Sequence, residues 1–332
     1  MHMAGTQNAL VLGGTGLVGQ YLVPQLIRQG FAVDIVSRGE RSAKSGESNV
    51  KLIKANLENQ NWIELAGIQL EVYDVIYHLA YAVGQNELLN REVTVNSVCQ
   101  LLERLSRLKD GKKRHFVYVG SMVIFGASPL DNVVTESSRR NVDSRYAENK
   151  LAATKFALTP AHGVVSTVLH PTGVYDEKSS RINKYRKLLS ANYVPASPRL
   201  GMNNIVHADD VANALVLCLR RNLENNSEYI INGQSLLYRD WFSYLEATVE
   251  KNCWLKLPEK FRYICRGPVR RFLNSIHICC PIFFSKQIGS ALLNKSVYSS
   301  DKAFKDFGYT GKKSFQKIIS QLPKQKGCHG TT

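Results

Sequence analysis

Two side chains four residues apart could act on one substrate atom. Tyr146 and Lys150 are the first and last residues of the segment YAENK, whose pattern predicts a helix running to about Thr159. Residues four apart share a helix face, so a phenol and an ammonium at these positions can address one site. The spacing alone is common and more often belongs to a surface pair. A third residue is therefore needed to favour chemistry.

Ser121 is that third residue. It follows a predicted strand, His115 to Val119, and the carboxyl ends of such strands are where parallel sheets bind ligands. Together with Tyr146 and Lys150 it suits hydride transfer at a carbinol or carbonyl carbon, in which a proton leaves or joins the oxygen. A free phenol, with a pKa of ~10, is a poor base at neutral pH. We expect Lys150 and an oxidised nicotinamide to lower the pKa of Tyr146.

A glycine-rich stretch near the start of the chain predicts the cofactor site. In NALVLGGTGLVG, from Asn8 to Gly19, a short apolar run leads into three glycines. Such glycines permit a tight turn, close approach of a pyrophosphate and close packing of the next helix, whose N-terminus favours anions. An ordinary glycine-rich turn is the alternative. The preceding strand, the amphipathic helix that follows and a second strand at Phe31 to Val36 favour dinucleotide binding, and the expected loop contacts are Gly13, Thr15, Gly16, Leu17, Val18 and Gly19.

The residues after the second strand indicate which dinucleotide binds. Ser37 and Arg38 stand where an acidic residue would accept bonds from the ribose 2′-hydroxyl, and a guanidinium instead suits a 2′-phosphate. Asp34 lies earlier and is interpreted as a strand residue. NADP(H) is therefore favoured over NAD(H), with a solvated basic loop as the alternative.

Strands and helices alternate along the chain. Further strands are predicted at Val50 to Lys54 and Asp74 to Leu79, and a long helix at Glu87 to Leu108. This order predicts an α/β fold with a Rossmann-like, doubly wound parallel sheet.

Several ordered motifs make the chain resemble an extended short-chain dehydrogenase/reductase of the NAD-dependent epimerase/dehydratase family, over essentially its whole length. The motifs are GGTGLVG at Gly13, HLA at His78, Asn96, GSMVIFG at Gly120, YAENK at Tyr146, PTGVY at Pro171 and IVHADDVANAL at Ile205. The chain departs from the family pattern at His170, where Arg is usual, at Asn56, where Asp is usual, and at Met122.

The resemblance implies two domains and a set of site residues. Residues 1–174 and 205–232 would bind the dinucleotide, and residues 175–204 and 233–332 would form a smaller, discontinuous substrate domain. Strands are implied at Gly163 to Leu169, Ile205 to His207 and Tyr229 to Ile231, with a helix from Asp209 to Arg221. Asn96 would hold a proton-relay water, and Lys150 would also bond the nicotinamide ribose. Further cofactor contacts would come from Asn56, Leu57, Leu79, Ala80, Pro171, Gly173 and Val174.

The charge distribution points to an anionic small molecule. Of the net charge of +16, residues 171–332 carry +13, with 25 Lys and Arg against 12 Asp and Glu. The charges are scattered, with no basic tail or aromatic-interleaved motif, so nucleic acid is not an expected partner, and no metal site is expected. A predicted amphipathic helix with a basic side follows PTGVY. Met122, Arg181, Lys184 and Arg199 are the candidate substrate contacts, and a homodimer is left open.

Cysteine usage and the N-terminus indicate the compartment. The seven cysteines include no CxxC pair, and the N-terminus lacks the basic region and cleavage site of a signal peptide, so a cytoplasmic setting is expected. The apolar stretch Ser275 to Leu293 is interrupted by Pro281 and Lys286. It is interpreted as packing within the substrate domain rather than as a membrane-surface contact.

Three functions fit these observations. The favoured one is an NADP-dependent reductase or epimerase acting on a nucleotide-activated sugar; dehydratases of the family carry an Asp–Glu pair where this chain has Met122 and Val123. The second is an NADPH-dependent ketoreductase or hydroxysteroid-type dehydrogenase on an apolar substrate. The third, a non-enzymatic NADP-binding regulator, would not need Ser121, Tyr146 and Lys150.

Overall fold

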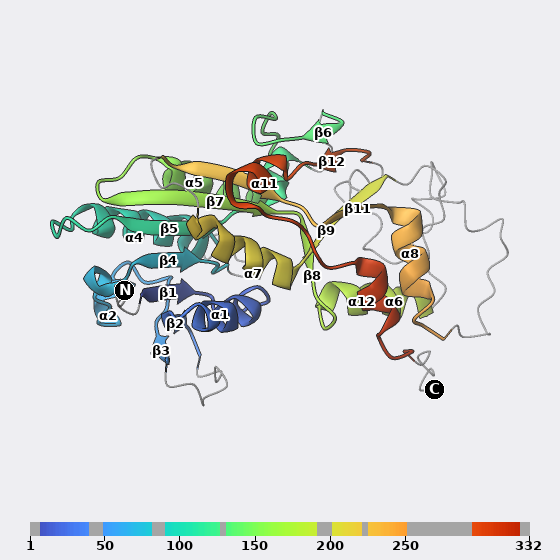
Figure 1. The fold of residues 1–332 in the computed structure, drawn as a ribbon, viewed down its shortest axis with the longest axis horizontal. Helices are drawn as coiled ribbons and strands as arrows, with labels where there is room; N and C mark the ends of the chain where they lie inside the picture. Colours follow the sequence, from blue (N-terminus) through green and yellow to red (C-terminus); the bar gives the residue numbers. More distant parts are fainter. Residues whose placement is uncertain are drawn as a thin grey trace, which may run out of the picture.

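The computed structural model describes most of the chain as two lobes of unequal size, with the sheet of the larger lobe on one side and helices α6, α8 and α12 on the other (Figure 1). The described residues are 7–39, 49–81, 90–126, 131–190, 201–220, 225–250 and 294–325. Arg199 and the apolar stretch 275–293 lie outside them.

A seven-stranded parallel sheet organises the larger lobe, in the order β10-β7-β5-β4-β1-β2-β3. All its neighbouring strands pair in parallel, which confirms the predicted doubly wound α/β fold. The chain leaves β1 towards β2 on one side and reaches β4 on the other, so β1 marks the point where such sheets bind ligands. The strands are β1 (Asn8–Leu12), β2 (Ala32–Ser37), β3 (Val50–Lys54), β4 (Val75–His78), β5 (Arg114–Val119), β7 (Val164–Pro171) and β10 (Ser227–Ile231).

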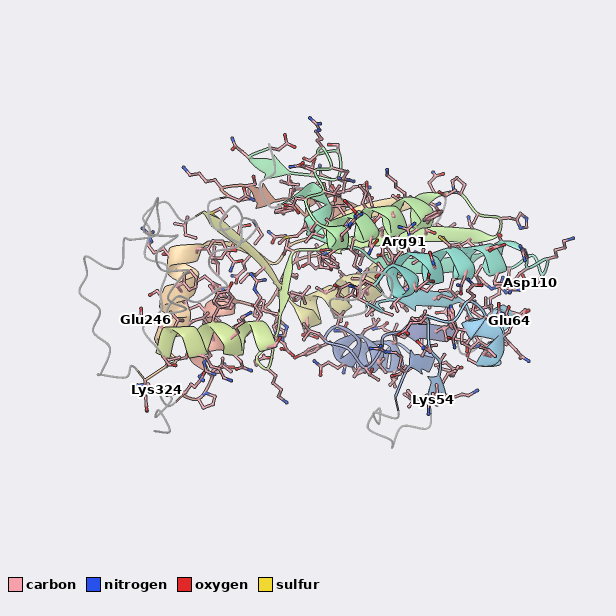
Figure 2. All side chains as sticks on the ribbon, turned by 180° about the vertical axis from the view of Figure 1, so that it is seen from behind. Lys54, Glu64, Arg91, Asp110, Glu246 and Lys324 are labelled. Atoms are coloured by element: carbon pink, nitrogen blue, oxygen red, sulfur yellow. The ribbon has the colours of Figure 1, made fainter. Side chains whose placement is uncertain are left out.

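Helices cover both faces of this sheet because the strands are apolar on both sides. One face packs on α1 (Gly19–Arg28) and α7 (Ala208–Leu217), through side chains such as Leu22 and Val211. The other packs on α2 (Trp62–Leu65), α4 (Ser97–Ser106) and α5 (Arg145–Leu158). In the reverse view α4 and α5 are turned towards the reader, and the labelled Glu246 and Lys324 mark the smaller lobe (Figure 2). Short helical turns complete the larger lobe: the 3-10 helices Leu70–Val72, Met122–Phe125 and Cys218–Arg220, and a π-helix at Glu92–Asn96.

The smaller lobe has its own apolar core. A three-stranded sheet, β11 (Gln234–Leu237), β9 (Met202–His207) and β8 (Gly173–Tyr175), lies beside α6 (Ser180–Ser190), α8 (Tyr238–Glu246) and α12 (Phe315–Ser320). Trp241 and Phe315 stack at 5.8 Å between ring centroids in this core. Strand β9 connects the lobes, because Ile205 packs in the small core and Val206 packs in the core of the sheet.

One C-terminal segment returns to the larger lobe, which differs from the expected domain boundary. Helix α11 (Asp301–Phe307) buries Ala303 and Phe307 in the core beside β10, and the Tyr229 hydroxyl donates to Asp306 at 2.7 Å. Strand β12 (Val297–Tyr298) pairs with β6 (Val133–Val134). Sequence pattern gave no sign of this return, since α11 is short and the contacts are long-range.

Across the described ranges, no helix has both the length and the apolar character needed to cross a bilayer.

Candidate active site

Helix α5 positions Tyr146 and Lys150 together. It begins after Ser144, whose hydroxyl accepts a bond from the Ala147 N–H at 3.3 Å, an N-cap that fixes the first turn. Tyr146 therefore lies in the first turn and Lys150 one turn later on the same face. Lys150 is almost fully buried, so the pair is not a surface pair.

Ser121 meets Tyr146 from the end of β5. Its backbone is extended, and its hydroxyl accepts from the Val123 N–H at 3.4 Å, which caps the following turn. The Ser121 hydroxyl lies beside the Tyr146 phenol and favours the ionised form of the tyrosine. The structure thus brings two of the three predicted catalytic side chains together.

The pKa of Tyr146 corrects one expectation. Burial, with a smaller contribution from the nearby Tyr81, raises it to about 12 even though the Ser121 hydroxyl lowers it. We expected Lys150 to lower this pKa, but Lys150 is directed elsewhere. The phenol is therefore neutral at pH 7, which is the form that donates a proton.

Lys150 is held by the strand rather than by the tyrosine. Its Nζ donates to the Val119 carbonyl at 2.8 Å and lies 5.0 Å from the centre of the Tyr118 ring. Burial lowers the pKa of Lys150 to about 7. An ammonium has three donors, so two can still bond a ligand.

Two aromatic residues at the site were missed from the sequence. The Tyr81 ring lies edge-on to Tyr146 at 4.8 Å, and Lys150 Nζ lies 5.7 Å from its centre. Tyr118 is fully buried beneath Lys150. Tyr81 directly follows the HLA motif, and that place after a strand end was the available signal.

The glycine loop has the shape that a pyrophosphate requires. Gly13 has a φ of +81°, and a Cβ there would lie 2.9 Å from the Ala80 nitrogen. A Cβ on Gly19 would lie 2.4 Å from the Gly14 oxygen, so only glycine allows α1 to pack this closely. Helix α1 begins after Val18 with no side-chain cap and no acidic residue in its first turn, which leaves its N-terminus suited to an anion. These residues fit the dinucleotide predicted for them, and Thr15, Gly16 and Leu17 lie in the same turn.

The end of β2 presents a guanidinium and a hydroxyl. Arg38 is exposed and lies 3.5 Å from Glu58, whereas Ser37 is half-buried at the strand end. Asp34 lies within the strand and accepts from the Tyr73 hydroxyl at 2.6 Å, as its interpretation as a strand residue requires.

The other predicted cofactor contacts gather at the same edge of the sheet. They follow or end the neighbouring parallel strands: Asn56 and Leu57 after β3, Leu79 and Ala80 after β4, Pro171 at the end of β7, and Gly173 and Val174 on β8.

The Asn96 side chain bonds a residue of its own helix. It ends the π-helix and donates to Glu92 at 2.6 Å, and it lines a groove between α2 and α4 with Gln60 and Glu64. A π-helix often marks a functional position, because its backbone bonds are irregular. The proton-relay role expected of Asn96 stays a prediction.

Helix α6 places one candidate substrate residue near the cofactor contacts. Arg181 is half-buried, bonds the Asn203 side chain at 3.3 Å, and lies so close to Gly173 that a Cβ there would meet its Nη1 at 2.5 Å. Lys184 is exposed, and Met122 is half-buried beside Ser121. The expected basic face of this helix is incomplete, because Arg186 is buried and bonds Thr248 at 3.0 Å.

Comparisons with known proteins agree with this fold. The model of the NAD dependent epimerase/dehydratase family matches residues 9–232. The UDP-glucose 4-epimerase of Thermotoga maritima, solved with UDP-glucose, is similar with a TM-score of 0.69 and 17% identity over 94% of this chain and 96% of that one. The Bordetella bronchiseptica enzyme WbmG, solved with NAD and UDP, is similar with a TM-score of 0.70 and 15% identity over 95% and 93%.

Two curated relatives differ in how much they share. The sterol-4-alpha-carboxylate 3-dehydrogenase, decarboxylating, of Dictyostelium discoideum is 21% identical over 95% of this chain and 100% of its own length. The bifunctional protein gal10 of Schizosaccharomyces pombe is 25% identical over 43% of this chain, and the match spans only about a fifth (22%) of gal10.

Proposed function

Because the chain belongs to the NAD-dependent epimerase/dehydratase family, it is an enzyme, and we propose that it uses NADP(H) to oxidise, reduce or epimerise a carbinol or carbonyl carbon of a nucleotide-activated sugar. The observation that carries the proposal is that Ser121 lies beside the Tyr146 phenol, with Lys150 buried one turn along the same helix.

Each of these residues has a role that follows from its position. The Ser121 hydroxyl donates to the substrate oxygen and fixes its approach to Tyr146. The neutral Tyr146 phenol donates its proton to that oxygen as a carbonyl is reduced, and takes it back in the reverse direction. Lys150 supplies a donor for the nicotinamide ribose. The bound nicotinamide supplies or accepts the hydride.

The glycine loop and the edge of the sheet would hold the dinucleotide. We propose that Gly13, Gly16 and Gly19 hold the pyrophosphate and that Pro171, Gly173 and Val174 line the nicotinamide. The preference for NADP(H) rests on Arg38 and Ser37, since Asp34 is engaged by Tyr73 within the strand. An exposed guanidinium at this place is suited to a 2′-phosphate.

The substrate class rests on Arg181 and on the charge of the later half. The guanidinium lies against Gly173, so a group bound there would be adjacent to the nicotinamide wall. A diphosphate would find Arg181 and Lys184 on one helix, three residues apart. Residues 301–309 then join the nucleotide-binding domain proposed at 1–174 and 205–232, in which strands β8 and β9 also pair in the sheet of the smaller lobe.

A second candidate function follows from one observation. The similarity to the Dictyostelium sterol dehydrogenase covers 95% of this chain and 100% of the dehydrogenase. A sterol or other apolar alcohol would use the same Ser121, Tyr146 and Lys150, with Met122 as an apolar neighbour of the reacting carbon.

Mass identification of nucleotides that copurify with the protein tests the proposal. We expect NADP or NADPH together with a nucleotide sugar. Recovery of a sterol, or stimulation of turnover by sterol alcohols and not by UDP-hexoses, would favour the second function.

A further inference from the structure

His170 is buried directly behind Ser121, where the family usually has arginine. Its Nδ1 lies 3.3 Å from the Ser121 backbone nitrogen and accepts the N–H. The ring lies so close to the strand end that a Cβ on Gly120 would come within 2.4 Å of Nδ1. Gly120 therefore permits a contact that any other residue would block.

The other side of the ring is held by a carboxylate. His170 Nε2 lies 2.9 Å from Glu228 Oε2, and the second oxygen of Glu228 accepts from Arg140 at 2.5 Å. The Arg140 guanidinium in turn lies 4.3 Å from the centre of the Phe125 ring, in the turn that Ser121 begins. His170, Glu228, Arg140 and Phe125 thus form a chain of contacts that supports the Ser121 backbone.

The two contacts allow one protonation state. Nδ1 must carry a lone pair to accept the Ser121 N–H, so Nε2 carries the proton and donates it to Glu228. A protonated ring would direct a second N–H at the Ser121 N–H, and the other tautomer would leave Glu228 without its donor. The support thus works only with the neutral imidazole in its Nε2–H form.

We infer that His170 is a positioning residue: oriented by Glu228, it fixes the Ser121 backbone so that the Ser121 hydroxyl faces Tyr146. The inference rests on the proposed hydride-transfer function for its kinetic consequence, but the tautomer can be measured without any substrate.

The charges around the ring decide its pH response. Glu228 and Glu136 favour the protonated ring, whereas burial, the largest effect, and Arg140 oppose it, so the pKa of His170 is lowered from its usual range. Lys302 adds a positive charge near Glu228, whose carbonyl it bonds at 2.8 Å. The ring is therefore neutral at pH 7, and Ser121 should lose its support only as the pH falls well below that.

Two isosteric substitutions separate the two contacts. In His170→Asn the amide oxygen can replace Nδ1 as acceptor, and in His170→Gln the amide nitrogen can replace Nε2 as donor. We expect His170→Gln to lower kcat roughly tenfold, the size of one lost hydrogen bond, with KM changed little. His170→Asn should retain most of the wild-type kcat and should lack the fall at low pH. In a Ser121→Ala background, His170→Gln should add less than about twofold.

Nitrogen-15 NMR of histidine-labelled protein at pH 7 tests the tautomer independently. His170, assigned by its loss in His170→Asn, should show a bare Nδ1 and a protonated Nε2, and Glu228→Gln should produce a mixture of tautomers, because an amide can also donate to Nε2. A protonated Nδ1 in the wild type would overturn the inference whatever the enzyme acts on. Equal kcat values for the Asn and Gln variants, or full additivity with Ser121→Ala, would also overturn it.

Discussion

Lys150 donates to the Val119 carbonyl at 2.8 Å, and this bond ties the buried ammonium to the end of β5 rather than to Tyr146. The lysine is thus part of the floor of the site. Its charge is buried, and burial lowers its pKa from 10.5 to about 7. The first prediction follows from this shift.

Lys150 should make stability depend on pH. Between about pH 7 and 10.5 Lys150 is protonated in the unfolded chain and deprotonated in the folded chain. The contribution of Lys150 to the free energy of unfolding therefore rises with pH. Lys150→Met should remove that rise. Thermal unfolding of both proteins at several pH values between 7 and 9.5 measures it. The matched control is Lys155→Met, an exposed lysine on the same helix, which should follow the wild-type pH trend. A parallel trend for Lys150→Met would contradict the buried, depressed lysine.

Tyr146→Phe should lower kcat by at least ~10²-fold while leaving the fold and the affinity for the dinucleotide nearly unchanged, because it removes only the proton donor. Steady-state kinetics and cofactor titration measure the two effects. Tyr81→Phe is the control, since it removes a hydroxyl from the neighbouring ring but keeps the edge-on contact with residue 146. Near-normal turnover by Tyr146→Phe would exclude this tyrosine from the mechanism.

Arg38→Ala should weaken NADPH binding by roughly ten- to a hundredfold, the value of a charge-assisted contact to phosphate, and should leave NADH binding unchanged. Fluorescence titration with both cofactors measures the difference. Arg28→Ala removes an exposed charge from the far end of α1 and should affect neither. Equal affinity of the wild-type protein for NADPH and NADH would reject the preference.

Reversing the charges of Arg181 and Lys184 together should raise KM for a nucleotide sugar with little change in NADPH binding. The effect should weaken at high salt, because part of it is long-range attraction. Lys187→Glu, an exposed reversal on the same helix, is the control. Normal KM in the double variant, or turnover of uncharged ketones only, would favour the second candidate function, in which the substrate is apolar.

The sheet was predictable because its strands are short apolar runs that end in recognisable residues. The prediction of Val50 to Lys54 was confirmed without change, and the other strands of the sheet differ from their predicted ends by one or two residues. The glycine loop and Ser121 were placed correctly at the carboxyl edge, since position after a strand is a local property.

The environment of the site was not predictable in the same way. The pKa of Tyr146 depends on burial, and the partner of Lys150 is a main-chain carbonyl that no side-chain pattern reveals. The support of Ser121 joins His170 to Glu228, which lie on different strands and far apart in the sequence. His170 could be recognised only as a departure from the family, with no indication of what it contacts.

Transfer of a deuterium label measures both hydride transfer and its dependence on Tyr146. The wild type and Tyr146→Phe would be incubated with NADP⁺ or NAD⁺ and with UDP-hexoses or sterol alcohols deuterated at the carbinol carbon, and products would be analysed by mass spectrometry and NMR. We expect the wild type to move deuterium to the nicotinamide, or to return it to the same carbon of an epimerised sugar, and Tyr146→Phe to do so at least ~10²-fold more slowly. Transfer by both proteins at the same rate, or by neither with any of these substrates, would contradict it.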